Sequence, residues 1–110
     1  MKMLYTVVME YGGGTYVSQI DASSVEQALR LWAAKLDAGA VAGLDHEGKV
    51  ELVDDIEEEL SNGGQPVPLT GLVNAWCASA WISGRGLMLI NIIATVPSAE
   101  AINRIRLPTR

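Results

Sequence analysis

Two apolar segments near the end of the chain constrain the fold more than any other feature of the sequence. They are LVNAWCASAWIS (residues 72–83) and LMLINIIATV (residues 87–96), and the residues SGRG (83–86) join them. Glycines at such a junction are typical of a hairpin turn, because glycine accepts the positive φ angles of tight turns. We therefore expect an antiparallel hairpin with its turn centred on Gly84 and Arg85.

Both faces of this predicted hairpin are apolar. The centred turn sets Trp76 opposite Ile93 and Trp81 opposite Met88, and a slip of one residue exchanges the two sets of side chains without removing the pattern. An antiparallel hairpin with one solvated face alternates apolar and polar residues, so this hairpin needs cover on both faces. One predicted face carries Trp76, Ala80, Ile82, Leu89 and Ile93, and the other carries Cys77, Trp81, Met88, Ile90 and Ile92.

Cover for the second face is scarce in the rest of the sequence. Helices can pack on one face, but the C-terminal segment offers only Ala101, Ile102, Ile105 and Leu107 for the other. A symmetric dimer is the commonest way to cover an apolar patch larger than monomers tolerate. Cover by the tail or by another helix is the alternative. We predict a homodimer, or another partner, on the face formed by Cys77, Trp81, Met88, Ile90 and Ile92.

The start of the chain predicts another hairpin. Residues 2–10 and 15–21 are rich in β-branched and aromatic residues, and Gly12 to Gly14 separate them. In a phosphate-binding loop, a lysine and a hydroxyl residue would follow the glycines and open a helix, whereas TYVSQI alternates as a strand does. We interpret the glycines as a turn that binds nothing. The predicted core face consists of Tyr5, Val7, Met9, Tyr16, Ser18 and Ile20.

A helix is predicted next, within DASSVEQALRLWAAKLDAG (residues 21–39). Ser23 and Glu26 have the spacing of a capping box, and Gly39 is a natural stop. Apolar residues recur at helical spacing and form one stripe, made of Val25, Ala28, Leu29, Trp32 and Leu36.

The following segment, LDHEGKVELVDDIEEELSNGG (residues 44–64), permits two interpretations at its start. Asp45 is a candidate N-cap for a helix that ends at Gly63, although KVELV alone could form a short strand. The acidic run is unsuited to a strand, which favours the helix with a stripe of Leu52, Val53, Ile56 and Leu60. Next comes QPVPLTG (residues 65–71), a predicted loop because its prolines cannot continue a helix.

These elements predict a single α+β domain in the order β-β-α-α-β-β. The 110 residues suit one domain, with an antiparallel sheet built from two hairpins and helices packed on one face. We assign residues 1–96 to the domain and residues 97–110 to a C-terminal tail, for which a short helix is one option.

The formal net charge of −5 limits the kinds of macromolecule that the protein is expected to bind. Phosphate backbones repel such a surface, so no nucleic acid is expected, whereas a basic protein partner would be attracted. Plain solubility is the alternative explanation of the charge. The first residues lack the long apolar core of a signal peptide, and no segment reaches the length that spans a membrane. One cysteine, Cys77, fits a reducing compartment, so we expect a cytoplasmic protein that binds no membrane.

No catalytic, metal or cofactor site is predicted. His46 is the sole histidine, and its neighbours Asp45 and Glu47 would not converge with it on a helix. Cys77 lies in an apolar segment far in sequence from that histidine, so it lacks the base that a nucleophile needs.

Aromatic and amide residues in the apolar segments are expected to be structural. Trp32, Trp76 and Trp81 are predicted to be core residues because aromatic side chains bury large areas. Asn74 and Asn91 interrupt apolar strands, and buried amides must form hydrogen bonds, so they either tie strands together or line a pocket.

An acidic run lies in the second predicted helix. A catalytic carboxylate pair would need a cleft, and a calcium site would need a loop punctuated by glycine; the run has neither. It is either a solvated helix face or a docking face for a basic partner. Its members are Asp54, Asp55, Glu57, Glu58 and Glu59.

The segment YTVVMEYGGGTYVSQIDASSVEQALRLWAAKL (residues 5–36) resembles the start of HicB-like antitoxins. The shared features are a strand, a glycine turn, a YVSQ-like strand and a helix that begins S-x-E-Q-A-L. The PGC-type segment that usually precedes the helix in that family is missing here, and we find no DNA-binding tail. The whole chain looks like small bacterial immunity-type or uncharacterised α+β proteins, which are compact, acidic and without active sites. Neither resemblance assigns a functional residue.

We therefore expect a non-enzymatic bacterial protein-binding module, antitoxin-like or immunity-like in its role. A homo-oligomeric structural protein is the alternative, followed by a small-molecule-binding domain or an enzyme. A deep pocket with convergent polar groups would favour an enzyme, and a flat acidic or apolar patch would favour a binding module.

Overall fold

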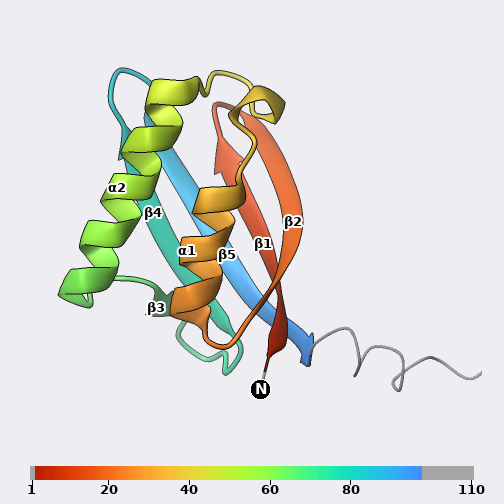
Figure 1. Ribbon diagram of the computed structural model, residues 1–110. Coiled ribbons are helices and arrows are strands. Elements are labelled where there is room, and N and C mark those ends of the chain that lie inside the picture. The colour runs from red at the N-terminus through yellow and green to blue at the C-terminus, as the bar shows by residue number, and fades with distance from the viewer. Residues whose placement is uncertain (1, 98–110) are drawn as a thin grey trace, which may run out of the picture.

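A five-stranded antiparallel sheet carries the fold, and both helices lie on one of its faces (Figure 1). The computed structural model describes residues 2–97, so the predicted tail helix and the apolar tail residues lie outside the described residues. The described chain is a single α+β domain, as predicted, with one additional short strand after the second helix. The elements are β1 (Met3–Tyr11), β2 (Gly14–Ala22), α1 (Val25–Lys35), the short 3₁₀ helix η1 (Ala38–Ala40), α2 (His46–Asn62), β3 (Val67–Pro68), β4 (Ala75–Ile82) and β5 (Gly86–Pro97). The strand order is β2-β1-β5-β4-β3.

The first hairpin forms with the predicted register. Gly12 and Gly13 make the turn with φ angles of 59° and 84°, and a two-residue hairpin turn of type I′ requires such positive angles at both positions. Met9 pairs with Tyr16, so alternate side chains of both strands point toward the helices. The predicted face therefore lies toward the helices, and four of its residues, Tyr5, Val7, Met9 and Ile20, are buried. Tyr16 is half-buried and Ser18 is exposed, so the prediction that these two belong to the core is not confirmed.

The cap of α1 lies one residue later than predicted. Ser24, and not Ser23, is the N-cap, and its hydroxyl oxygen accepts a hydrogen bond from the Gln27 N–H at 3.1 Å. The side-chain oxygen of Gln27 accepts in turn from the Ser23 N–H at 2.7 Å. Gln27 therefore accepts the hydrogen bond from Ser23 that was predicted for Glu26. The side chain of Glu26 is exposed instead.

The predicted apolar stripe of α1 is confirmed. Val25, Ala28, Leu29 and Trp32 are buried against the sheet, and Leu36 packs partly at the C-cap. The helix ends at Lys35, earlier than the predicted stop at Gly39.

The structure resolves the ambiguity at the start of α2 in favour of the helix. Asp45 is the N-cap, and its Oδ1 accepts from the Gly48 N–H at 2.8 Å. Gly63 ends the helix in the left-handed conformation, with φ of 72°. Leu52 and Ile56 are buried, while Val53 and Leu60 pack partly against the core, so the predicted stripe is confirmed.

The register of the second hairpin is one residue away from the prediction. The chain turns over residues 83–85, so Trp76 pairs with Ile92 and Trp81 with Leu87. The side chains of the two strands therefore divide differently between the two faces of the sheet. Ala78, Ala80, Ile82, Met88, Ile90 and Ile92 face the helices and are buried.

The predicted loop at residues 65–71 contains the short edge strand β3. Val67 pairs with Cys77 of β4. Proline is tolerated in edge strands, because the outer side of such a strand needs no N–H donor. The strand is two residues long, too short for a periodicity to reveal it in the sequence.

We predict that Trp32→Ala lowers the free energy of unfolding by about 3–5 kcal/mol, as truncation of a buried aromatic side chain does. Trp32 is 5% exposed and lies on the apolar stripe of α1. Thermal or denaturant unfolding measures the change. Lys35→Ala, at an exposed position of the same helix, is the matched control. Equal stability of the wild type and the Trp32 variant would contradict the assigned face of α1.

Candidate functional site

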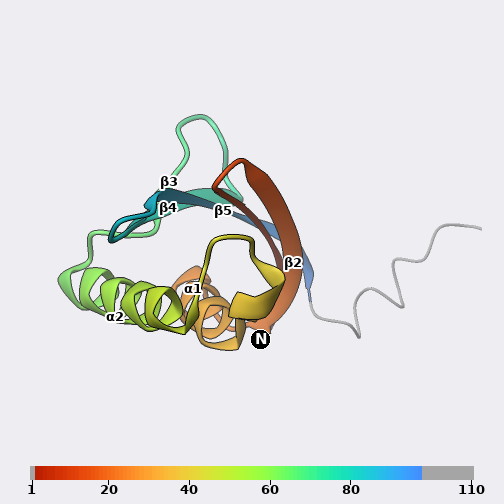
Figure 2. The same cartoon turned by 90° about the horizontal axis from the view of Figure 1, so that it is seen from above.

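The face of the sheet that lies away from the helices is the candidate functional site. Figure 2 shows α1 and α2 in one layer below the sheet, and only the loop between β3 and β4 above it. No helix of the described residues covers this face, which we call the open face. Side chains alternate along each strand, so every second residue of β1, β2, β4 and β5 points to the open face.

A row of side chains crosses the open face from edge to edge. The pairings place Val17, Val8, Asn91, Cys77 and Val67 side by side on β2, β1, β5, β4 and β3. Four of these five side chains are apolar or weakly polar, and the amide of Asn91 lies half-exposed between them.

Large exposed apolar side chains gather on one side of this row, toward the tip of the second hairpin. Trp81 of β4 is 63% exposed, and its cross-strand partner Leu87 of β5 is 49% exposed. Leu89, which is 38% exposed, lies beside them on β5. We call Val8, Val17, Cys77, Trp81, Leu87 and Leu89 the apolar patch.

The structure separates the residues that were predicted to form one interface. Cys77 and Trp81 lie on the open face, but Met88, Ile90 and Ile92 are completely buried under the helices. The one-residue difference in register is the physical cause, because it moves every side chain of one strand to the opposite face. Leu87, Leu89 and Asn91 take the predicted places of the three buried residues.

The prediction that all three tryptophans are core residues is correct for Trp32 and wrong for Trp81. Trp76 packs partly against the core, and its ring meets that of Tyr5 edge to face, with centroids 6.2 Å apart. Asn74 ties strands together, because its Nδ2 donates to the Ala94 carbonyl at 3.2 Å.

Two contacts with α2 hold the tip of the second hairpin. Arg85 donates to a carboxylate oxygen of Asp45 at 2.9 Å and also to the Gly43 carbonyl. The Glu51 carboxylate accepts from the Ser83 N–H at 3.0 Å and from its hydroxyl at 2.6 Å. These contacts fix the turn over residues 83–85, and they thereby fix Trp81 and Leu87 on the open face.

The Asp45 carboxylate serves the helix and the hairpin together. The Gly48 N–H and the Arg85 guanidinium both favour its ionised form, and together they lower the pKa of Asp45. The group therefore stays charged in its double role as N-cap and ion-pair partner.

The acidic run lies on α2, in the layer opposite the open face. Glu57 pairs with Arg30 at 2.8 Å, and Glu59 accepts from the side-chain amide of Gln65 at 3.2 Å. Asp54 and Glu58 are exposed, while Asp55 is half-buried. Two of the five carboxylates thus have partners within the chain, and docking of a basic protein by the run stays a prediction.

Asp55 is the member of the acidic run whose negative charge is disfavoured by its surroundings. Partial burial and the neighbouring carboxylates of Glu59, Glu58 and Glu51 raise the pKa of Asp55. Its ionised form is therefore disfavoured in the folded protein.

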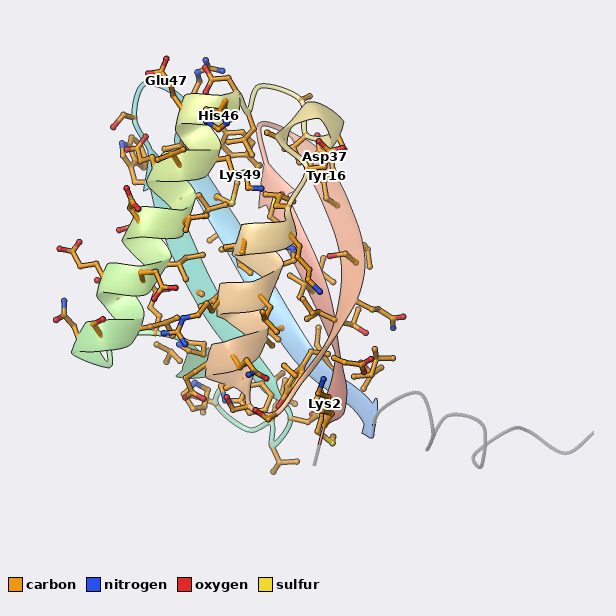
Figure 3. The ribbon with its side chains drawn as sticks, viewed as in Figure 1. Lys2, Tyr16, Asp37, His46, Glu47 and Lys49 are labelled. Carbon is orange, nitrogen blue, oxygen red and sulfur yellow. The ribbon has the colours of Figure 1, made fainter. Side chains whose placement is uncertain are left out.

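A shallow groove of about 560 Å³ lies between the end of α1 and the start of α2. His46, Lys49 and Asp37 line it, and Figure 3 shows them at the end of the molecule where the helices are joined. Lys49 donates to the Ala34 carbonyl at 2.9 Å, and Asp37 accepts from the Gly39 N–H at 2.9 Å. Two of the three polar groups therefore serve the connection between the helices.

The described residues hold neither a metal-binding cluster nor a membrane-spanning helix. Among them, no group of three or more His, Cys, Asp and Glu side chains could hold a metal ion. Within residues 2–97, neither helix is long and apolar enough to cross a membrane. No family model, curated protein or solved structure matches the chain.

We predict that Asp55→Asn raises the unfolding temperature at pH 7. The pKa of Asp55 is higher in the folded than in the unfolded chain, so its contribution to stability is fully present below its ordinary pKa of 3.8. That contribution is lost as the pH rises through the raised value. The increase in unfolding temperature caused by Asp55→Asn should therefore become smaller as the pH falls toward about 3. Thermal unfolding across this pH range measures the difference.

Asp54→Asn is the matched control for this prediction, because it removes the same charge at an exposed position of the same helix. The same gain in both variants would show that net charge, and not the surroundings of Asp55, sets the effect.

Proposed function

We propose that this chain is a non-enzymatic protein-binding module and that its open face binds a second copy of the chain. The observation that carries the proposal is the exposure of Trp81, Leu87 and Leu89 next to one another on a hydrogen-bonded sheet. Large apolar side chains gathered on one face mark protein-interaction sites more often than single scattered ones do.

The size of the open face suits a dimer. Strands about 4.8 Å apart and about eight residues long, with a rise of about 3.3 Å per residue, give a five-stranded face an area on the order of 600 Å². The loop between β3 and β4 adds Leu72 and Val73, which are both exposed. A standard interface buries about 800 Å² on each partner, so the face and the loop together approach what a stable dimer needs.

The distribution of charge favours a second copy over a basic protein on this face. Glu10 and Asp21 are the charged residues that the strand pairings place on the open face, and they lie near opposite ends of the first hairpin. The acidic run lies on α2 in the other layer (Figure 2). Two copies can therefore meet through their open faces while their acidic helices point away from each other.

A non-enzymatic role is supported by the separation of the reactive side chains. Cys77 lies on the open face, whereas His46 lies at the start of α2 in the other layer. A nucleophile and its base must come within hydrogen-bond reach, and these two elements hold the side chains on opposite sides of the sheet.

The biological role that we propose is that of an antitoxin-like or immunity-like module in a bacterial cytoplasm. The acidic run would attract a basic target protein, and the dimer would present two such runs. A reducing compartment suits a thiol on an interface, because Cys77 side chains of two copies could otherwise cross-link.

We predict that the wild-type chain, of 11.8 kDa, has twice that mass at micromolar concentration and that Leu89→Lys weakens dimerisation at least about tenfold. A lysine at this position would place a charge inside the interface. Analytical ultracentrifugation over a concentration series measures both dissociation constants, and circular dichroism verifies that the variant is folded.

Val50→Lys is the matched control, because Val50 is similarly exposed but lies on α2, away from the open face. It should dimerise like the wild type. A wild type that stays monomeric throughout, or a dimer that tolerates Leu89→Lys, would overturn the proposal.

A further inference from the structure

Within the part of the chain that the structure describes, the outer edge of β2 carries unpaired main-chain groups. In an antiparallel pair, alternate residues direct their N–H and C=O groups to the partner strand, and the residues between them direct these groups away. The two-residue turn makes Tyr11 and Gly14 a hydrogen-bonded pair. The residues of β2 whose main-chain groups point outward are therefore Thr15, Val17, Gln19 and Asp21.

The other edge of the sheet is closed by several contacts. Val67 of β3 pairs with Cys77, and the Leu69 N–H donates to the Ala75 carbonyl. The side-chain amide of Gln65 accepts from the Ser79 N–H and donates to the Ser79 carbonyl, so it replaces one residue of a neighbouring strand. Natural proteins protect their sheet edges with such devices, and in the described residues β2 has no comparable cover.

A mostly apolar pocket of about 200 Å³ adjoins this open edge. It lies between residues 18–20 of β2 and the end of α1, where Trp32 and Leu36 contribute apolar surface. Gln19 lines the pocket too. Its side chain, however, donates to the Thr6 hydroxyl on the open face, whereas the pocket lies on the helix side of the sheet. Gln19 therefore meets the pocket with its main chain, so the pocket and the unpaired edge groups are contiguous.

From this juxtaposition we infer that the β2 edge binds an extended peptide segment of another protein, which adds a sixth strand and inserts an aliphatic side chain into the pocket. Main-chain hydrogen bonds to Val17 and Gln19 would supply affinity. Directly paired residues on neighbouring strands share a face of the sheet, so the peptide residue opposite Ser18 or Ile20 would point into the pocket. Figure 1 shows β2 at the margin of the sheet.

A second copy of the chain fits this edge less well than a peptide does. In an antiparallel pairing of two β2 strands centred on Ser18, the small hydroxymethyl group of Ser18 from the second copy would face the pocket. Tyr16 is the larger neighbour, but its hydroxyl already accepts from the Ala42 N–H at 3.0 Å, and Figure 3 shows it where β2 meets the loop after α1. The second copy would leave the pocket unfilled, whereas an aliphatic peptide side chain would fill it.

The charges around the pocket set the chemistry of the peptide. Lys35 and Asp37 both line it, and Asp37 already accepts from the Gly39 N–H. In the described residues Lys35 forms no ion pair. A peptide with an aliphatic residue at the pocket and no excess of lysine or arginine beside it therefore complements the site best.

Titration of the isotope-labelled full chain with defined peptides tests the inference by NMR. The probe is the capped heptapeptide TSTLTSK, and its control TSTKTSK has lysine in place of leucine. We expect the leucine peptide to shift the amide signals of Thr15, Val17, Gln19 and Asp21 and the indole signal of Trp32. The lysine peptide should bind at least about tenfold more weakly, because it would bring a positive charge into an apolar pocket beside Lys35.

Two pairs of variants separate the edge from the pocket. Gln19→Pro removes an outward N–H donor without breaking a bond to β1, and Gln19→Ala removes the same side chain but keeps the donor. Ser18→Leu fills the pocket from within, and Ser18→Ala leaves it open. We expect Gln19→Pro and Ser18→Leu to lose at least about tenfold in affinity for the leucine peptide, while each alanine variant binds like the wild type.

Any one of four results would overturn the inference. The first is that the leucine and lysine peptides bind equally, and the second is that neither shifts the β2 amides at millimolar concentration. The third is that the outward amides of β2 are protected from hydrogen exchange without peptide at every protein concentration, which would mean that the chain covers its own edge. The fourth is that this protection rises with protein concentration, which would mean that a second copy covers the edge. Dimerisation through the open face is measured separately by mass, so the two proposals can fail independently.

Discussion

The pairing of β1 with β5 is the contact on which the rest of the structure depends. It joins the hairpin at the start of the chain to the hairpin at its end, and it places Val7 beside Ile92 and Met9 beside Ile90 in the centre of the core. Both helices belong to the single connection between these hairpins, and both cross the same face of the sheet. The opposite face is left open for that reason, although it carries Trp81, Leu87 and Leu89.

Sequence reasoning located the elements well where a local signal decides them. The register of the first hairpin follows from Gly12 and Gly13, because two adjacent glycines with positive φ specify a two-residue turn. The stripes of both helices and the caps at Asp45 and Gly63 are also local patterns, and the structure confirms them. The cap of α1 was one residue off, because two consecutive serines offer the same chemistry.

Local sequence signals do not determine the register of the second hairpin. Gly84 and Gly86 both have positive φ, and both faces of the hairpin are apolar, so neither turn chemistry nor hydrophobic pattern distinguishes two registers one residue apart. Contacts from α2 hold the observed turn, through Asp45 to Arg85 and Glu51 to Ser83. These partners are distant in sequence, so the site residues Met88, Ile90 and Ile92 were assigned to the wrong face. The pocket beside β2 also depends on α1 and could not be foreseen from the strand alone.

Chemical modification of Cys77 tests the central claim, that the open face is the surface that binds a second copy. Cys77 is the sole cysteine and lies half-buried in the row of side chains that crosses this face. Its reaction rate with a thiol reagent should be measured over the concentration range in which the mass of the protein doubles. The account predicts that the rate falls as the dimer forms, because the second copy covers the thiol. A constant rate across the same range would contradict the account, since the dimer would then use another surface.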